Sequence, residues 1–598
     1  MGSEQTARLL PTVDDWLARL EAALAAADPT ATAALFEADS HWRDVLALTW
    51  RIVTVSGGDR LAGELARLGR TRALTGLKVH PGRCPPRTVE RAGVEVIEAM
   101  IGFETDVGRG SGIVRFRLDA APGAPARAWT LLTALDELRG HEEATLRAAR
   151  EGPVFDRDFH GPNWLDRRRA AAAYADRDPT VLIVGGGHAG LTAAARLGQL
   201  DVDALVVDRM ARVGDNWRLR YHGLKLHNQK HSNHLPYLPF PETFPAYLSK
   251  DQIANWLEIY AEAMEIAFWT ETSFEGAAWD DAAGCWTARL RLVDGSIREM
   301  RPRHIVMATS VSGTPSLPDI PTLDRFAGEV VHSSRFGDGA AWRGRDVLVF
   351  GTGTSAHDIA QDLHGSGARV TMIQRSPTLV VNVEPSAQLY DGVYLGPGPS
   401  LDDRDLINAS MPLPLMRTAH KLLTDRVREL DKPLLDGLEK AGFRLSFGEN
   451  GTGWPLLYRT RGGGYYFNVG CSDLIAAGKL PVVQYADIEA FEAGGARLAD
   501  GRLLAAELVV LATGYKGQDH MVRTLFGDAV AERAGPVWGF DPETQELRNM
   551  WSRTGHPGLW FTAGAFSQCR NYSKYLALAI KAEELGLMRS AGEGSWSG

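Results

Sequence analysis

The sequence predicts an α/β protein built from two similar strand–helix units, with a smaller α+β domain in front of them. From about residue 179 onward, short runs rich in Val, Leu and Ile alternate with helical segments, which is typical of parallel βαβ units. Two of the strand–helix junctions carry the same glycine-rich pattern. In the first 150 residues, helical periodicity gives way to strands with polar turns, an order that favours an α+β domain.

Length and composition indicate a folded chain of several domains. At about 150 residues per domain, the 598 residues predict roughly three or four domains. Hydrophobic residues make up 44% and charged residues 23%, which is ordinary for a globular protein. The formal net charge of −9 leaves no basic excess to neutralise phosphates, so we expect no nucleic-acid partner. No run reaches 18 uncharged apolar residues, so we expect no membrane span.

Cysteine usage argues against a disulfide framework and against a zinc ribbon. The four cysteines lie far apart and form no C-x-x-C pair, which also excludes the redox-active pair of disulfide reductases. Residues 1–10 carry no apolar signal core. We therefore expect a cytoplasmic protein.

The N-terminal block, predicted to span residues 1–150, begins with helical patterns. Trp16, Leu20 and Leu24 recur at the spacing of one helix face. The apolar segments 42–55 and 61–68 predict two further helices. Three strand patterns follow the Pro-rich loop at 81–86, over residues 94–105, 112–118 and 128–138.

This order of elements resembles the NTF2-like cone fold, also called SnoaL-like. Enzymes of that fold use an Asp in a cone-shaped pocket as a base, and Asp44 is the candidate here. No partner tyrosine can be identified by pattern, so a packing or lid role is favoured for this domain. A role as a binding or dimerisation module is the alternative. A linker over residues 151–178 follows.

The first glycine-rich pattern is a G-x-G-x-x-G at Gly185, Gly187 and Gly190, between a buried-strand pattern and a helical pattern. The first glycine allows the tight turn, the second lets a pyrophosphate approach, and the third allows close helix packing. The helix N-terminus offers N–H groups and the positive end of its dipole. The next strand pattern ends at Asp208, 18 residues after Gly190, where an acid binds a ribose 2′-OH.

The second pattern is a G-x-G-x-x-A that begins at Gly351 and ends at Ala356. Alanine is accepted in the third glycine position. The next strand pattern is followed by Arg375, 19 residues after Ala356. An arginine there accommodates a 2′-phosphate, which an acid would repel. Two Rossmann-like units with opposite charges at this position predict FAD in the first and NADPH in the second.

Between the two patterns lies F-x-G-x-x-x-H-x-x-x-[YF], with Phe326, Gly328, His332 and Phe336 at its fixed positions. It resembles the identifying motif of flavin-containing monooxygenases, the class B flavoprotein monooxygenases. Three further segments resemble motifs of that family over roughly residues 178–598: a G-G-x-W-like turn ending in Trp217, a late A-T-G-[YF] with Thr513 and Gly514, and an earlier A-T-G in which Ser310 replaces Gly.

The resemblance implies an NADPH-dependent monooxygenase that transfers one oxygen of O2, through a C4a-hydroperoxide of the flavin, to nitrogen or sulfur of a small organic substrate. Members of the Baeyer–Villiger branch usually end the motif in Trp followed by Pro or Asp, whereas Phe336 and Gly337 stand here. That branch stays an alternative. Decarboxylating oxidation is a second alternative, because L-K-L-H at 224–227 resembles plant indole-pyruvate monooxygenases. A non-oxygenating FAD-dependent NADPH oxidoreductase is the third alternative, and the missing C-x-x-C pair argues against it.

Site residues follow from the patterns and from the resemblance. By a loose alignment, His227 or Asn228 falls where animal members keep an active-site Asn. Four histidines within 13 residues, His222 to His234, suggest loop hydrogen bonds over the flavin more than a metal site, and we expect no metal. The expected cofactor-binding residues are Gly185, Gly187, Gly190, Asp208, Trp217, Phe326, Gly328, His332, Gly351, Gly353, Ser355, Ala356, Arg375, Thr513 and Gly514.

The same patterns predict the domain limits. The first part of the FAD-binding domain is expected over 179–325, the NADPH-binding domain with an insertion over 326–484, and the second part of the FAD-binding domain over 485–598. A small-molecule substrate and O2 are the expected partners. A homodimer is left open.

Overall fold

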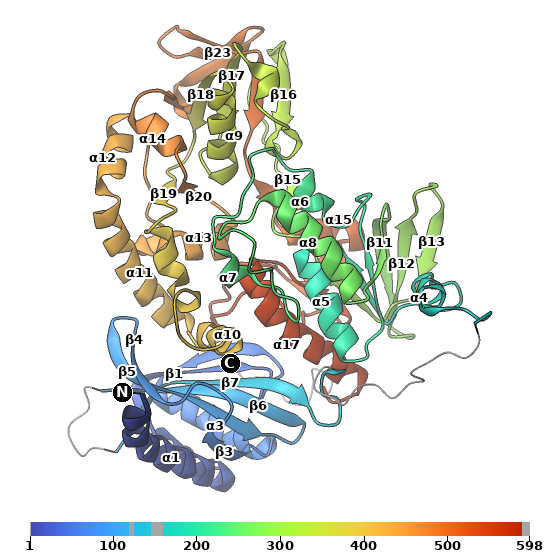
Figure 1. The fold of residues 1–598 in the computed structure, drawn as a ribbon, viewed down its shortest axis with the longest axis vertical. Coiled ribbons are helices and arrows are strands. Elements are labelled where there is room, and N and C mark those ends of the chain that lie inside the picture. Colours follow the sequence, from blue (N-terminus) through green and yellow to red (C-terminus); the bar gives the residue numbers. More distant parts are fainter. Residues whose placement is uncertain (1, 119–124, 145–158, 589–598) are drawn as a thin grey trace.

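The computed structural model describes residues 2–118, 125–144 and 159–588 (Figure 1). An N-terminal domain lies at one end of the molecule, and two parallel sheets with their helices form the rest. None of the helices among the described residues combines the length and the apolar character needed to span a bilayer.

The N-terminal domain is a mixed α+β domain of one curved sheet and three helices. The sheet order is β2-β1-β7-β6-β5-β3, and β4 pairs with β5. Strand β1 is antiparallel to β2 and parallel to β7. The elements are α1 (Gly2–Ala26), α2 (Pro29–Ala33), β1 (Phe36–Val45), β2 (Ile52–Ser56), α3 (Gly58–Thr71), β3 (Thr75–Val79), β4 (Arg87–Arg91), β5 (Val94–Glu104), β6 (Gly108–Arg117) and β7 (Ala128–Leu138).

The helix predicted over residues 42–55 is wrong, because this segment forms the hairpin of β1 and β2. The carboxylate of Asp44 accepts hydrogen bonds from the amides of Leu48 and Thr49 and so folds the turn. Leu46 has a φ of 67°, in the left-handed region, where a helix cannot continue. The same carboxylate also accepts from the hydroxyls of Thr49 and Thr133. Asp44 is therefore fully engaged in the fold of its own domain.

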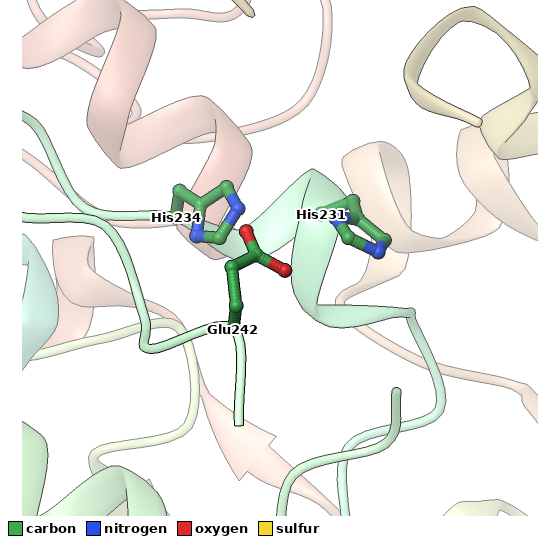
Figure 2. Close-up of side chains that lie close together, drawn as sticks. All are labelled: His231, His234 and Glu242. Carbon is green, nitrogen blue, oxygen red and sulfur yellow. The ribbon is translucent and has the colours of Figure 1, made fainter. Parts of the chain in front are cut away.

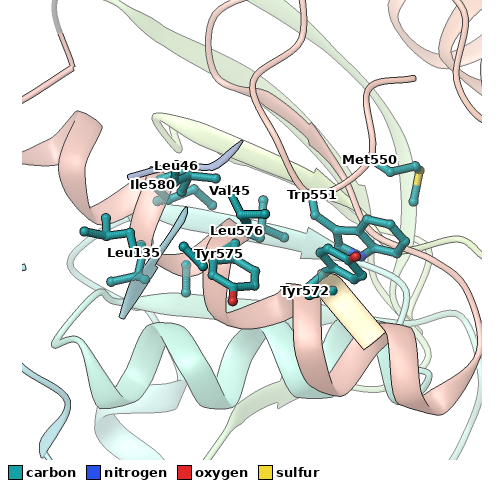
Figure 3. Close-up of a cluster of buried hydrophobic side chains, with 14 of the residues drawn as sticks. Val45, Leu46, Leu135, Met550, Trp551, Tyr572, Tyr575, Leu576 and Ile580 are labelled. Atoms are coloured by element: carbon teal, nitrogen blue, oxygen red, sulfur yellow. The ribbon is translucent and has the colours of Figure 1, made fainter. Parts of the chain in front are cut away.

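The N-terminal domain packs on the last long helix, α17 (Phe566–Glu584). Val45, Leu46 and Leu135 lie against Leu576 and Ile580 of this helix in one buried cluster (Figure 3). Polar contacts surround the apolar ones: Lys574 Nζ donates to Asp136 at 2.5 Å, and Arg83 pairs with Asp403 at 3.0 Å. The domain is thus joined to the rest of the chain by a buried apolar interface and not by the linker alone.

The first parallel sheet has the order β10-β9-β8-β14-β27 and collects strands from distant parts of the chain. Helices α5 and α17 pack against each other beside it. A small antiparallel sheet, β11-β12-β13, lies alongside. The elements are α4 (Trp164–Ala172), β8 (Val181–Val184), α5 (His188–Gln199), β9 (Ala204–Val207), α6 (Asp215–Arg218), α7 (Lys230–Asn233), α8 (Lys250–Ala263), β10 (Ala267–Trp269), β11 (Ser273–Asp280), β12 (Cys285–Arg291), β13 (Ile297–Met300), β14 (His304–Met307), α15 (Gln518–Phe526), α16 (Asp528–Ala534) and β27 (Leu559–Phe561).

The second parallel sheet has the order β16-β25-β17-β18-β21. Its β25 comes from late in the chain, beyond the domain limit predicted between residues 484 and 485. The order of strands in the sequence does not predict this pairing, because β25 lies between β16 and β17 in the sheet. The elements are β15 (Thr314–Pro315), β16 (Glu329–His332), β17 (Asp346–Phe350), α9 (Thr354–Gly365), β18 (Arg369–Gln374), α14 (Cys471–Ala476), β21 (Val482–Gln484), β22 (Ile488–Glu492), β23 (Gly495–Leu498), β24 (Leu503–Ala505), β25 (Leu508–Leu511) and β26 (Tyr515–Lys516).

A mostly helical insertion follows β18 and reaches from the second sheet down to the N-terminal domain (Figure 1). It contains β19 (Leu379–Asn382), η5 (Ala387–Tyr394), α10 (Leu401–Ala409), α11 (Leu413–Leu430), α12 (Lys432–Lys440), α13 (Gly453–Arg461) and β20 (Tyr465–Asn468). Residues 145–158 lie outside the described residues. They include the predicted domain limit at 150 and the start of the predicted linker.

Two candidate dinucleotide-binding sites

The two glycine-rich turns have the same backbone geometry. Gly185 follows β8 with a φ of 110°, and Gly351 follows β17 with a φ of 114°, a region that residues with a Cβ rarely adopt. A Cβ at Gly185 would lie 2.6 Å from the carbonyl oxygen of Ala308, and one at Gly351 would lie 2.3 Å from that of Ala512. Each turn therefore needs glycine for conformation and for space.

The second glycines begin the helices that follow. Gly187 has φ −77° and ψ −176° before α5, and Gly353 has φ −83° and ψ −173° before α9. Neither helix has a side-chain hydrogen bond at its N-cap. The first-turn N–H groups and the positive end of each helix dipole are thus left for an external anion, which fits a pyrophosphate.

The third positions explain why one turn has glycine and the other alanine. A Cβ at Gly190 would lie 2.0 Å from the carbonyl oxygen of Gly185, so α5 packs too closely for any side chain. Ala356 in α9 is fully buried, which shows that the second helix leaves space for one methyl group.

The residues after the second strands differ in charge and in surroundings. Asp208 accepts hydrogen bonds from the amides of Gly186 (2.7 Å) and Met210 (2.9 Å), so its carboxylate is fixed beside the first turn. Arg375 is exposed at the end of β18, and among the described residues no carboxylate lies within 4.0 Å of it. A negative group is thus fixed beside the first turn, whereas an exposed cation follows the second strand of the other unit.

Aromatic side chains surround the start of α5. His188 stacks on Phe566 with ring centroids 4.1 Å apart, and its Nε2 lies 2.9 Å from the carbonyl oxygen of Gly564, just before α17. The indole of Trp217 lies 5.7 Å from Phe566. His188 Nδ1 and Trp217 Nε1 are buried without a hydrogen-bond partner among the described residues. Unmatched polar atoms beside two helix N-termini fit a bound polar cofactor.

The motif at 326–336 lies where the loops between the two sheets meet. His332 Nδ1 accepts from the amide of Ser334 (3.1 Å), and Nε2 donates to the carbonyl oxygen of Gly514 (3.1 Å). Burial lowers the pKa of His332, which favours this neutral form. A Cβ at Gly328 would lie 2.5 Å from the Glu507 carbonyl oxygen and from the ring of Phe326.

The late A-T-G-Y segment is held by the same contacts. Thr513 donates its hydroxyl to the carbonyl oxygen of Ser316 at 2.6 Å. Gly514 has a φ of 82°, and Tyr515 packs edge-on against His332. Thr513 and Gly514 thus lie beside His332, whereas Phe326 and Gly328 pack on β25 and its neighbours.

His227 and Asn228 lie against the insertion. The ring of His227 packs edge-on against Phe467 at 5.4 Å, and burial lowers its pKa to about 4. Asn228 Nδ2 donates a short hydrogen bond to Asp391. Burial raises the pKa of Asp391 to about 6. His227 is consequently neutral near pH 7, and it has no charge with which to attract an anion.

The histidine-rich loop brings three possible metal ligands together: His231, His234 and Glu242 (Figure 2). Two observations favour the hydrogen-bonding role instead. His234 Nδ1 accepts from the amide of Phe240 at 3.0 Å, and the ammonium of Lys230 lies 3.2 Å from the Glu242 carboxylate. The lysine already supplies the positive charge that a metal ion would bring.

Sequence reasoning missed one buried pair near the second turn. Tyr221 donates to Asp358 of α9 at 2.7 Å, and burial raises the pKa of Asp358 to about 7. Ser355 also hydrogen-bonds Tyr221. The pair joins the loop after α6 to the second unit, and no spacing signal connects residues so far apart in the sequence.

Comparison with known proteins agrees with this geometry. Residues 182–390 match the family described as Pyridine nucleotide-disulphide oxidoreductase. Indole-3-pyruvate monooxygenase YUCCA1 of Oryza sativa subsp. japonica is 33% identical over 340 residues, which is 56% of this chain and 77% of the relative. Probable indole-3-pyruvate monooxygenase YUCCA4 of Arabidopsis thaliana is 31% identical over 340 residues, 56% of this chain and 76% of the relative.

Solved structures share the fold. An open crystal structure of cyclohexanone monooxygenase has a TM-score of 0.52 and 16% identity, over 68% of this chain and 88% of that one. A mutant cyclohexanone monooxygenase from Rhodococcus sp. Phi1, bound to NADP+, has a TM-score of 0.51 and 16% identity, over 69% of this chain and 86% of that one.

Two Rossmann-like sheets with matched glycine turns define a flavin- and pyridine-nucleotide-dependent oxidoreductase. Over about residues 180–590, the chain belongs to the NADPH-dependent flavin monooxygenase family, the class B flavin monooxygenases. Members of this class use FAD and NADPH.

Proposed function

We propose that the chain inserts one oxygen atom of O2 into a small organic substrate, by N- or S-oxygenation, with FAD in the first site and NADPH in the second. The observation that carries this assignment is the pair of matched turns with opposite charges after their second strands, Asp208 and Arg375. An acid suits a free ribose hydroxyl, and an arginine suits a 2′-phosphate.

The first site would hold FAD through four groups. The N–H groups at Gly187 and the start of α5 face the pyrophosphate, and Asp208 binds the adenosine ribose. The buried Nδ1 of His188 and Nε1 of Trp217 supply polar contacts near the N-terminus of α17. Bound FAD supplies the redox and oxygen chemistry, which the side chains of the protein lack.

The second site would hold NADPH. The start of α9 at Gly353 faces the pyrophosphate, where a Cβ would find its nearest atom 3.9 Å away. Ser355 and Ala356 continue this turn, and Arg375 pairs with the 2′-phosphate. Phe326, Gly328, His332, Thr513 and Gly514 fix the loops between the two sites, and we propose that they keep the nicotinamide in place and exclude water.

His227 and Asn228 are proposed as the polar residues that face the substrate side. Both are tied to the insertion, since Gln388 Nε2 donates to the carbonyl oxygen of His227 and Asn228 contacts Asp391. We propose that the insertion, placed between β18 and β21, shapes the substrate side of the FAD site. The FAD-binding unit would then comprise residues 179–325 and about 513–588, with the NADPH-binding unit and its insertion between them.

A second candidate is decarboxylating oxidation of an oxo acid. It is supported by the similarity to relatives named indole-3-pyruvate monooxygenases. Baeyer–Villiger oxidation of a ketone is the weaker candidate, because its support is the fold of cyclohexanone monooxygenase alone. The four cysteines are free and far apart, which gives no support to a disulfide reductase.

One screen tests the proposed function. The FAD-loaded protein is supplied with NADPH and 18O-labelled O2 and is offered amines, sulfides, ketones and oxo acids, while H2O2 is measured. We expect one labelled oxygen in an N-oxide or S-oxide and little H2O2 with that substrate. Label in an ester, or loss of CO2 from an oxo acid, would select one of the other candidates. NADPH consumption without labelled product from any class would contradict a monooxygenase.

A further inference from the structure

A cavity lies where three parts of the chain meet: the N-terminal domain, the insertion and the C-terminal part of the first unit. Strand β1 contributes Arg43, α13 contributes Arg459, and α17 contributes Gln568 and Tyr572. Glu546, from the loop before β27, closes another side. The N-terminal domain, which lies outside the two nucleotide-binding units, therefore forms part of a cavity wall.

One of the two arginines in the cavity is neutralised. Arg43 Nε and Nη2 each donate to a carboxylate oxygen of Glu546 at 2.7 Å, in a bidentate pair. Thr54 of β2 donates to the same carboxylate at 2.7 Å, and Arg43 also reaches the Tyr572 hydroxyl at 3.1 Å. The capacity of Glu546 is largely used by these contacts.

The other arginine has no such partner. The guanidinium of Arg459 makes a close contact with the sulfur of Met416, and among the described residues no carboxylate lies within 4.0 Å of it. Arg459 is half-buried, and desolvation lowers the pKa of its guanidinium. With Arg43 and Glu546 cancelling each other, the cavity carries one uncompensated positive charge.

The cavity is close to the proposed flavin site. Gln568 lies in the first turn of α17, where its Oε1 accepts from the amide of Ala565 at 3.0 Å. The residue before that amide, Gly564, offers its carbonyl oxygen to His188 of the first glycine-rich turn. One helix N-terminus thus separates the unpaired arginine from the first site.

We propose that this cavity receives the carboxylate of the organic substrate, with Arg459 as its binding partner and with the N-terminal domain as one wall. The substrate class is then an organic acid. This rests on the proposed function and names the substrate class for that site. Arg459 is half-buried, has five N–H donors and contacts one sulfur, so a carboxylate oxygen pair is the partner that best matches its free donors.

The size and the lining of the cavity fit this assignment. Its volume of about 40 Å³ holds one small polar group and not a whole organic acid. Met411, Met416 and Met550 line it, and methionine side chains repack easily around a bound group. Phe540 lines both this cavity and an outer groove, whose charged residues Arg417, Lys421 and Glu449 leave one net positive charge on the approach for an anion.

A matched pair of ligands tests the proposal without turnover. Phenylacetate and phenylacetamide have the same shape and differ in charge, and their binding to the FAD-loaded protein is measured by calorimetry. We expect the wild-type protein to bind the acid about 10- to 100-fold more tightly than the amide, as a charge-assisted hydrogen bond predicts. Sodium sulfate, a free inorganic anion, should bind at least about 10-fold more weakly than the acid.

Two variants of Arg459 test whether this residue causes the preference for the acid. Arg459→Met should reduce the preference for acid over amide to less than about threefold, while Arg459→Lys should keep part of it. Arg461→Met is the matched control, because Arg461 is exposed on the same helix and should leave the preference unchanged. FAD content confirms that each variant is folded.

The outcomes separate this proposal from the proposed function. Equal binding of acid and amide by the wild-type protein would overturn it even if a variant failed to fold. An unchanged preference in folded Arg459→Met, or sulfate binding as tight as acid binding, would overturn it as well. None of these binding results depends on NADPH or O2. A protein without monooxygenase activity could therefore still prefer the acid, and an active monooxygenase could still bind acid and amide equally.

Discussion

The Nε2 atom of His332 lies 3.1 Å from the carbonyl oxygen of Gly514, so the end of β16 is bonded to the loop after β25. The opposite ring nitrogen accepts from the amide of Ser334 at 3.1 Å. The ring is therefore fixed at both nitrogens, in a neutral form. Of the residues in the motif that resembles the family's identifying sequence, His332 makes the contact that reaches the late A-T-G-Y segment.

The first prediction concerns this contact. In His332→Ala, the loops at Gly514 lose their tie, and we expect NADPH oxidation to continue while a much larger share of its electrons is recovered as H2O2, because water enters the site. The measurement is the ratio of H2O2 to NADPH consumed. Ser334→Ala is the control, because it removes only the 2.9 Å contact of the Ser334 hydroxyl with His332 Nδ1 and keeps the Ser334 amide and the bond to Gly514. A lower melting temperature with an unchanged ratio would assign His332 a packing role only.

The second prediction concerns FAD binding. Gly187→Val should abolish the flavin colour of the purified protein, because a side chain there would enter the space for the pyrophosphate and would meet Asn216 Nδ2 at 2.7 Å. Gly198→Ala, in the same helix, is the control, since nothing lies within 4 Å of its Cβ. The measurement is FAD per chain. A Gly187→Val protein with full FAD occupancy would contradict the assignment of FAD to the first site.

The third prediction concerns the choice of nicotinamide cofactor. Arg375→Ala should raise KM for NADPH about 10- to 100-fold and leave KM for NADH nearly unchanged, because only NADPH has the 2′-phosphate. Arg369→Ala serves as the control, since Arg369 is exposed on the same strand and pairs with Asp346 instead. Equal weakening of both cofactors by Arg375→Ala would mean a structural role.

The fourth prediction concerns pH. Burial raises the pKa of Asp358 from 3.8 to about 7, so the folded state holds this proton more tightly than the unfolded chain does. The carboxyl therefore favours folding at low pH, and that contribution is lost as the pH rises through about 7. Asp358→Asn cannot ionise, so its melting temperature relative to wild type should be higher at about pH 8 than at about pH 5. A difference that does not change with pH would show that Asp358 is not buried as a neutral acid.

The fifth prediction concerns the join between the N-terminal domain and the rest. Arg43→Met leaves Glu546 buried without its partner, which typically costs about 3–5 kcal/mol. Thermal unfolding should show a large loss for Arg43→Met and for Glu546→Gln, and a double variant should lose clearly less than the two losses combined. Additive losses would mean that the two side chains do not act as a pair.

Local patterns in the sequence predicted the glycine turns well. Gly185 and Gly351 are recognisable because the strand, the turn and the helix are contiguous, and the charge of Asp208 or Arg375 comes at a fixed distance after them. The packing of Gly185 on Ala308 and of Gly351 on Ala512 was not predictable, since it depends on strands that enter each sheet from elsewhere in the chain.

Features that depend on contacts between distant parts of the chain could not be predicted from the sequence. The segment 42–55 has enough apolar residues for a helix, but the positive φ of Leu46 and the bonds to Asp44 turn it into a hairpin. The cavity joins Arg43, Arg459 and Glu546, which are hundreds of residues apart, so no spacing rule could group them. The assignment of His227 and Asn228 rests on a loose alignment, and their contacts with Phe467 and Asp391 place them beside the insertion.

The central claim is that FAD in the first site accepts hydride from NADPH in the second, and anaerobic titration of the purified protein tests it most directly. We predict about one FAD per chain, loss of the visible flavin absorption on addition of one equivalent of NADPH, slower loss with NADH, and return of the absorption when air is admitted. A protein without bound flavin, or a flavin that NADPH does not reduce, would contradict the account.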